Sequence, residues 1–260
     1  MRTTGLYVAV ALAAMIGPAL AADIAPAPVE TAVANDQGWR FQATAYGWAS
    51  GVSGDVGILG RPPQSVDITP LQALEHLDGA FMGSFLAQHG DWLILTDLIW
   101  AKIDDHDFGP NGGSIDFVQK QLTASGVVGY QLPIAVPDLE LHATAGFRYQ
   151  HMNVELDVAT PDPAVSFSGE WTKQWIDPTI GFSAHYDIND RWFVTVIGDV
   201  GGFGVASKIT AQGFATIGYN WTKTISTAIG YRAIYTDYEK DGFVYDTTQQ
   251  GVFTSVGIHF

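Results

Sequence analysis

The chain ends in Gly251-Val252-Phe253-Thr254-Ser255-Val256-Gly257-Ile258-His259-Phe260. Side chains alternate between the two faces of an extended strand, so every second residue shares a face. One face then carries Val252, Thr254, Val256, Ile258 and Phe260, and the other carries Ser255, Gly257 and His259. The segment is therefore predicted to be a strand with one apolar face, one polar face and an aromatic last residue.

This ending resembles the closing strand of bacterial outer-membrane β-barrels. The resemblance rests on the apolar face and the final aromatic, carried by Val256, Ile258 and Phe260. It implies an outer face in contact with outer-membrane lipid and lipopolysaccharide. It also implies the barrel-assembly machinery as a partner during biogenesis, because in that class the terminal aromatic belongs to the signal which that machinery reads.

The other end of the chain reads as an export signal. Arg2 precedes a short apolar core at residues 5–16, and Pro18 with Ala19-Leu20-Ala21 forms an A-x-A cleavage pattern. The core is shorter than the roughly 20 residues of a membrane-spanning helix. We expect a signal peptide at residues 1–21, a flexible periplasmic lead-in at 22–38 and one barrel domain at 39–260.

Composition narrows the class of protein. The charged residues give 12 − 27 = −15, an acidity that argues against nucleic acid as a partner. The absence of cysteine excludes disulfide scaffolds, thiolate catalysis and Cys-ligated metals. Abundant glycine and aromatic residues are typical of all-β proteins. We expect no cofactor and no metal ion.

From Trp39 onward the pattern has period two, broken repeatedly by turn residues. It predicts an antiparallel transmembrane β-barrel of about ten strands, with eight or twelve as alternatives. Long connections are expected outside the cell at residues 53–76, 104–113, 157–170 and 239–246. Short periplasmic turns are expected at residues 89–91, 187–190 and 221–223, and the connection at 202–206 is short for an outer loop.

The clearest alternation follows residue 139. Glu140, His142 and Arg148 share one face, while Leu141 and Phe147 share the other. In a soluble sandwich the apolar face would point into a core, and in a membrane barrel it would point to lipid. Period alone does not choose between them. The export signal and the terminal aromatic favour the membrane barrel and a Gram-negative outer-membrane location.

Aromatic residues are expected to form two belts at the membrane interfaces, because their rings combine an apolar body with a polar tip. The predicted periplasmic belt consists of Trp92, Tyr130, Tyr186, Trp192, Tyr219 and Trp221. The predicted outer belt consists of Tyr149, Trp171, Tyr231 and Tyr235.

Charged and polar residues on the opposite face are candidates for the barrel lumen. They are Arg40, Asp97, Glu140, His142, Arg148, Asp177, His185, Asp199 and Arg232. Both signs of charge are present, so these residues could pair across the barrel and form a structural plug. The alternative is a narrow channel for ions or small solutes.

Catalysis is a third interpretation, in which the chain is an outer-membrane hydrolase that acts on lipid A or peptide. Glu140, His142, Ser183 and His185 fall on matching faces of successive strands, so a Glu–His–Ser cluster is geometrically available. No G-x-S-x-G or H-E-x-x-H motif accompanies it. The acidic run Asp104-Asp105-His106-Asp107 could hold a hard cation, but it lacks the spacing of a calcium loop and is expected to face water.

Three further segments resemble those of small, uncharacterised proteobacterial outer-membrane barrels, of the broad OmpA and porin-like class. They are Ala45-Tyr46-Gly47-Trp48-Ala49-Ser50-Gly51, Gly90-Asp91-Trp92 onward to Asp97, and Gly198-Asp199-Val200-Gly201-Gly202-Phe203-Gly204 followed by Ser207. The resemblance implies a transmembrane barrel and no catalytic residues, and Asp199 is expected to anchor the lumen beneath the outer loops. We expect a non-enzymatic role in envelope structure or surface interaction. The sequence patterns do not indicate an oligomeric state.

Overall fold

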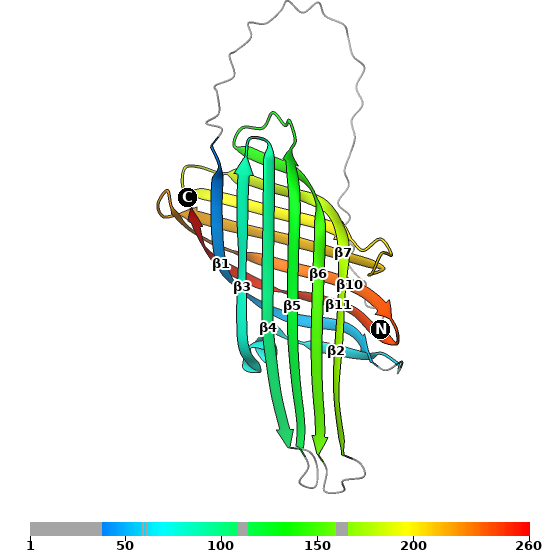
Figure 1. Ribbon diagram of the computed structural model, residues 1–260. Coiled ribbons are helices and arrows are strands. Elements are labelled where there is room, and N and C mark those ends of the chain that lie inside the picture. Colours follow the sequence, from blue (N-terminus) through cyan, green and yellow to red (C-terminus); the bar gives the residue numbers. More distant parts are fainter. Residues whose placement is uncertain (1–37, 59, 61, 109–113, 160–165) are drawn as a thin grey trace, which may run out of the picture. The chain divides into compact units, whose positions relative to one another are not determined.

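The computed structural model describes residues 38–58, 60, 62–108, 114–159 and 166–260. One antiparallel sheet of 11 strands contains almost all of its regular structure (Figure 1). In chain order the elements are β1 (Arg40–Gly57), β2 (Gln64–Ile68), α1 (Pro70–Glu75), β3 (Leu77–His89), β4 (Trp92–Phe108), β5 (Ser114–Gln131), β6 (Leu139–Ala159), β7 (Phe167–Asp187), β8 (Trp192–Gly201), β9 (Ile209–Asn220), β10 (Ile225–Lys240) and β11 (Phe243–His259).

The sheet closes on itself. Strands β3 to β11 pair in sequence order, and β1 pairs with β3 on one side and with β11 on the other. The last contact runs from the Gln42–His259 pair to the Gly57–Val244 pair. Strand β2 pairs only with β1, at Val52–Val56, along the same edge of β1 that pairs with β3 at Arg40–Ala45. The molecule is therefore a closed, ten-stranded antiparallel barrel, which confirms the fold predicted from the alternation.

The ring is sealed at the end that carries Phe260, which we call the terminal end. Phe41 and Phe260 exchange two backbone hydrogen bonds of 2.9 and 3.0 Å, and their rings stack at 5.7 Å. The short connections around residues 90, 189 and 222 lie at this same end. Antiparallel pairing places alternate connections at one end, so this grouping follows from the strand order.

The barrel wall is uneven at the opposite end, which we call the extended end. Strands β6 and β7 have 21 residues each, whereas β8 has 10 and β9 has 12. In Figure 1 strands β4 to β7 run well beyond the rest of the wall. The predicted loops at 104–113 and 157–170 were therefore wrong in their bounds, because the alternation continues through the charged residues. Residues 109–113 and 160–165 lie outside the described residues.

The predicted connection at 53–76 was also wrong in part. It contains the end of β1, strand β2 and helix α1. The helix begins with a capping box, in which Thr69 Oγ1 accepts from Gln72 N and Gln72 Oε1 accepts from Thr69 N. Pro70 occupies the first turn, where its missing N–H costs nothing. The Thr-x-x-Gln spacing was the available signal for this helix.

The predicted outer loop at 239–246 is a two-residue turn. Lys240 pairs with Phe243, and Asp241 and Gly242 both have positive φ, at 51° and 72°. Asp-Gly is the preferred pair for such a hairpin, because both central residues need this backbone conformation. Only these two residues therefore connect strands β10 and β11.

The outer surface of the ring is apolar and its interior is polar. Ile180, Ile229 and Val252 point outward and are about half exposed, at 54%, 56% and 51%. Arg148 and Asp177 are buried inside, at 1% and 0%. This arrangement is the reverse of a soluble protein and is the arrangement of a transmembrane barrel.

Within the described residues, the only helix is far too short to cross a membrane. The predicted signal peptide and almost all of the lead-in lie outside the described residues.

Candidate functional site

The barrel interior contains a cavity of about 870 Å³ in the half nearest the terminal end. All ten strands of the ring contribute to its lining, and Asp190, Trp221 and Lys223 of the short turns line its mouth. Leu86, Leu93, Leu95 and Val127 form an apolar part of the wall, although lumen-facing positions were expected to be polar. Both faces of β4 are apolar here, so alternation gave no signal for these residues.

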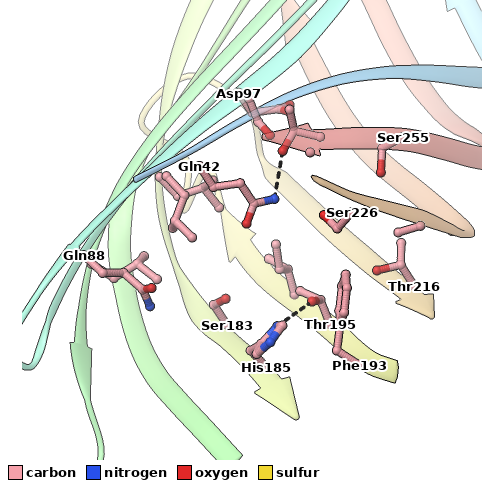
Figure 2. Close-up of a pocket in the computed structure, with 18 of the residues that line it drawn as sticks. Gln42, Gln88, Asp97, Ser183, His185, Phe193, Thr195, Thr216, Ser226 and Ser255 are labelled. Atoms are coloured by element: carbon pink, nitrogen blue, oxygen red, sulfur yellow. Dashed lines mark hydrogen bonds between the residues drawn. The ribbon is translucent and has the colours of Figure 1, made fainter. Parts of the chain in front are cut away.

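Polar groups line the cavity near its mouth (Figure 2). Arg40 donates to Glu140 at 2.9 Å, and Gln88 also donates to Glu140 at 3.2 Å. His185 Nδ1 lies 3.0 Å from Thr195 Oγ1. His259 Nε2 lies 2.8 Å from Ser226 Oγ. Glu140, His185 and His259 are therefore each already in contact with a polar partner.

The residues of the catalytic interpretation lie close together, but they are not joined by the hydrogen bonds of a triad. Glu140 is the cross-strand neighbour of His185, and His142 is that of Ser183. In the described part of the chain, no hydrogen bond joins His142 to Ser183, and the hydrogen bonds of Glu140 go to Arg40 and Gln88. A nucleophile needs a base within hydrogen-bond reach and a third group that orients the base. The geometry does not provide this triad.

A charged network spans the lumen above the cavity. Arg232 donates to Asp97 at 2.8 Å, to Tyr46 at 3.1 Å and to Gln212 at 2.7 Å. Tyr46 in turn donates to Asp97 at 2.7 Å. Gln212 donates to Asp199 at 3.2 Å and so connects this cluster to the second ion pair of the lumen.

The second ion pair joins Arg148 to Asp199. One guanidinium nitrogen lies 2.8 Å from both carboxylate oxygens, and the other donates to Thr210 at 2.9 Å. The Arg148 and Arg232 side chains are only 1% and 5% exposed. A charge buried this deeply is tolerated only when it is paired and hydrogen-bonded. The network meets this requirement while it crosses the barrel from wall to wall.

Asp177 was predicted to be one of the lumen charges that pair across the barrel, but its partner is a serine of a connection. It is fully buried and accepts from both the backbone N–H and the hydroxyl of Ser207, at 2.7 and 2.6 Å. Ser207 belongs to the β8–β9 connection, which the carboxylate thereby holds against the lumen. Asp199, which was predicted to be a lumen anchor, lies in the lumen and is bound to Arg148 and Gln212.

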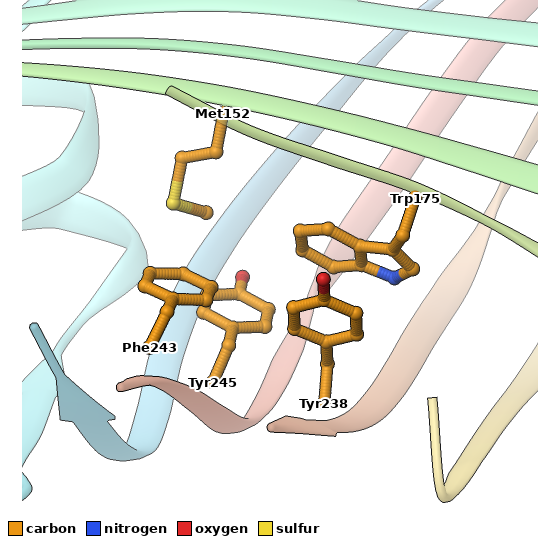
Figure 3. Packing of buried hydrophobic residues seen from close by; sticks show 5 residues of the cluster. All are labelled: Met152, Trp175, Tyr238, Phe243 and Tyr245. Carbon is orange, nitrogen blue, oxygen red and sulfur yellow. The ribbon is translucent and has the colours of Figure 1, made fainter. Parts of the chain in front are cut away.

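Two apolar layers fill the lumen toward the extended end. The first contains Trp48, Ile99, Ile234 and Phe253. The second contains Met152, Trp175, Tyr238, Phe243 and Tyr245, each exposed by 6% or less (Figure 3). Trp175 and Tyr238 stack face to face at 4.2 Å from opposite sides of the barrel. The cavity is therefore separated from the extended end by one charged layer and two apolar layers.

All nine residues predicted for the lumen lie on the inner face. Eight of them line the cavity, and Asp177 lies beyond it. The polar partners Tyr46, Gln212, Thr210 and Ser207 were missed. Alternation placed Tyr46, Thr210 and Gln212 on the correct face, whereas Ser207 lies in the β8–β9 connection, where alternation gives no signal. Only the barrel closure brings strands β1, β9 and β10 against β4 and β6.

Most of the predicted interface aromatics point outward. Trp92 and Tyr130 pack edge to face at 5.0 Å near the terminal end, as do Trp192 and Tyr219. Tyr186, Trp221 and Tyr231 are exposed at 41%, 65% and 48%. Tyr149 and Tyr235 are half-buried and donate to Gln174 and Asp246. Trp171 was assigned to the wrong face, since its position in the register puts it on the inner side, where it stacks on Phe167.

The polarity of the two faces inverts at the extended end. The outward side chains of β6 are apolar up to Phe147 and Tyr149, and then become His151, Asn153, Glu155 and Asp157. The inward side chains change in the opposite sense, from Arg148 and Gln150 to Met152, Val154, Leu156 and Val158. The apolar outward band of the four long strands ends at Trp100, Leu122, Tyr149 and Ile176, and beyond it only Val118 and Ala159 are apolar among the described outward residues. We call the parts of β4 to β7 beyond this line the extension.

The outer face of the extension is charged and paired. Lys102 lies 2.7 Å from Asp78 and 3.3 Å from Asp104, and these carboxylates raise the pKa of Lys102 through hydrogen bonds, Asp78 more than Asp104. Lys120 lies 2.7 Å from Glu155. Among the described residues no group of His, Asp and Glu side chains could hold a metal ion.

The closed ring, the apolar outer surface and the filled polar lumen define the chain as a transmembrane β-barrel. No protein-family model matches the chain, and no curated protein matches it. The resemblance to small proteobacterial barrels therefore stays a prediction.

Solved structures with a similar arrangement are outer-membrane or surface proteins. The outer membrane protease OmpT from Escherichia coli is 10% identical, with 86% of this chain and 97% of that chain covered and a TM-score of 0.48. The attachment invasion locus protein Ail of Yersinia pestis is 11% identical, with coverages of 86% and 99% and a TM-score of 0.37. Neisserial surface protein A is 15% identical, with coverages of 85% and 97% and a TM-score of 0.33. Likenesses at this level assign neither a family nor an activity.

Proposed function

We propose that the chain is a non-enzymatic integral protein of the Gram-negative outer membrane, with a lumen that does not conduct and an extension that presents an interaction surface outside the cell. The observation that carries this proposal is the stack of layers in the lumen. The Arg232–Asp97 and Arg148–Asp199 pairs and the Trp175–Tyr238 stack all lie between the cavity and the extended end. An ion would have to displace paired charges and then cross buried aromatic side chains.

The polarity inversion supports the orientation. In bacterial barrels the short turns lie in the periplasm and the longer connections lie outside. The terminal end carries the short turns around residues 90, 189 and 222, although the two-residue turn at 241–242 lies at the extended end. The extension carries an outward face rich in charge, as expected for a segment beyond the lipid. The extension is a continuous sheet held by cross-strand pairs, so it can present a fixed surface.

Electrical silence is the first expected result. The refolded protein in a planar bilayer should give no discrete conductance steps, because each arginine of the charged layer is paired with a carboxylate and the aromatic layer is buried. Incorporation is checked on the same sample by the slower gel mobility after boiling that folded barrels show. Reproducible steps whose size changes in Asp199→Asn would show a small pore and overturn the plugged lumen.

Cysteine labelling tests the orientation, since the natural chain contains no cysteine. We expect Asp157→Cys, in the extension, to react with a membrane-impermeant maleimide on intact cells. Asp190→Cys, in a turn at the terminal end, should react only after the outer membrane is opened. Both residues are exposed, so unequal accessibility of the side chains does not explain a difference. The reverse pattern would place the extension in the periplasm.

A further inference from the structure

Among the described strands, one edge of the extension has no partner. Strand β7 pairs with β6 along its length, from the Val158–Phe167 pair to the Leu139–Tyr186 pair. It pairs with β8 only from Thr179 onward. Within the part of the chain that the structure describes, the segment before Thr179 therefore has a neighbouring strand on one side only. An unpaired edge of this kind is a template for another extended chain, since its backbone donors and acceptors are free.

The backbone groups that face this edge can be identified. Pro178 O accepts from Gly202 N at 3.0 Å on the side where β8 begins. Successive residues of a strand direct their N–H and C=O groups to opposite sides, and the β6–β7 register has no interruption. Residues of the same parity as Pro178 therefore face the free edge. Those in the extension are Ser168, Glu170, Thr172 and Gln174.

The side chains beside the edge differ on the two faces. On the inner face Phe167 and Trp171 stack at 5.8 Å over Gly169, and Phe167 is 46% exposed. On the outer face Glu170, Thr172 and Gln174 are exposed. A strand added here would place alternate side chains next to these aromatic rings and next to these polar groups.

The charge of the extension limits which kind of extended segment could bind at this edge. The described outward side chains of the extension include the carboxylates Asp104, Asp116, Glu155, Asp157 and Glu170, but only the two amines Lys102 and Lys120. The whole chain carries a formal charge of −15, so a second copy would be repelled. A segment with basic residues on its outer face complements this edge.

We propose that the edge formed by Ser168, Glu170, Thr172 and Gln174 binds an extended segment of a partner protein by strand addition. The segment carries apolar residues at alternate positions, which cover Phe167 and Trp171, and basic residues between them, which lie along Glu170. Main-chain hydrogen bonds supply the affinity and the alternate side chains supply the selectivity. The inference rests on the proposed function, because it requires the extension to lie outside the membrane.

Proline substitution tests the edge without disturbing the β6–β7 ladder. Thr172→Pro removes an N–H that points away from β6, and proline is tolerated at such positions. Thr172→Val is the matched control, because it keeps the N–H and loses the same side-chain bond from Asn153. The probe is a fluorescent ten-residue peptide of alternating lysine and valine, titrated by anisotropy against the full protein in nanodiscs. A peptide of the same composition with its lysines and valines in two blocks is the second control.

We expect the alternating peptide to bind wild type and Thr172→Val equally, and Thr172→Pro about tenfold more weakly, which corresponds to roughly 1.4 kcal/mol. The block peptide should bind all three weakly. Equal binding to Thr172→Pro, or no binding to any variant, would overturn the inference. A wild-type dimer that Thr172→Pro converts to a monomer would identify a second copy as the occupant and also overturn it. If binding fails while Asp157→Cys is labelled from outside, the inference falls and the proposed function stands.

Discussion

Replacing Gly230 by alanine should prevent most molecules of the protein from folding into the barrel. A Cβ atom at this position would overlap the carbonyl oxygen of Ala215 and lie 2.7 Å from Thr216 Cα, both of them backbone atoms of the neighbouring strand β9. Backbone atoms in a paired strand cannot move aside as a flexible side chain can. We expect the free energy of unfolding to fall by more than about 3 kcal/mol, at the upper end of the cost of overpacking.

Gly213→Ala is the matched control for this prediction. Gly213 lies on β9 itself, one of the two strands involved, and a Cβ atom there would meet nothing within 4 Å. Both variants are refolded into the same vesicles and unfolded in urea, with tryptophan fluorescence and gel mobility as independent measures. Equal stability of Gly230→Ala and Gly213→Ala would contradict the close approach of β9 and β10.

Replacing Arg232 by leucine should be the most destabilising change to a charged side chain of the lumen. It leaves Asp97 without its counter-ion and removes the donors to Tyr46 and Gln212. It also removes a guanidinium that lies 5.3 Å from the centre of the Trp48 ring. Loss of one member of a buried ion pair typically costs about 3–5 kcal/mol, because the remaining charge stays buried. Asp97 borders the cavity, so some hydration should keep the cost near the lower value.

Arg40→Gln is the comparison for this variant. Arg40 lies 2.9 Å from the carboxylate of Glu140, close to the 2.8 Å of the Arg232–Asp97 pair, but the Arg40 side chain is 62% exposed. Exposed pairs contribute at most about 1 kcal/mol, so the unfolding midpoint should hardly change. The double variant Arg232→Leu, Asp97→Leu should recover part of the loss, since it removes the orphaned charge. Equal midpoints for Arg232→Leu and Arg40→Gln would mean that the network does not hold the lumen together.

The candidate site was predictable to the level of faces and no further. Alternation placed Asp97, Arg148, Asp199 and Arg232 on the inner side. It gave no means of choosing partners, because Arg148 and Asp177 are direct cross-strand neighbours and yet Arg148 binds Asp199. The choice depends on the β8–β9 connection, which turns inward and occupies Asp177 through Ser207.

The errors at the extended end have one physical cause. The prediction places loops at the charged residues after Ile103 and Leu156, because in lipid an outward charge would end a strand. Backbone pairing does not depend on lipid, and once the strands leave the membrane charge is favourable on the outward face. The inverted alternation of Val154, Glu155, Leu156 and Asp157 was visible in the sequence, but it indicates a sheet only if the barrel is known to continue there.

What the sequence determines by itself is the period of two and the apolar stripe on each strand. These features are local, because they depend on side-chain alternation along a single strand. What only the tertiary structure decides is which lumen charges pair, which layers close the lumen and which edge of β7 lacks a partner. These features depend on the distance between strands far apart in the chain, and closing the ring sets that distance.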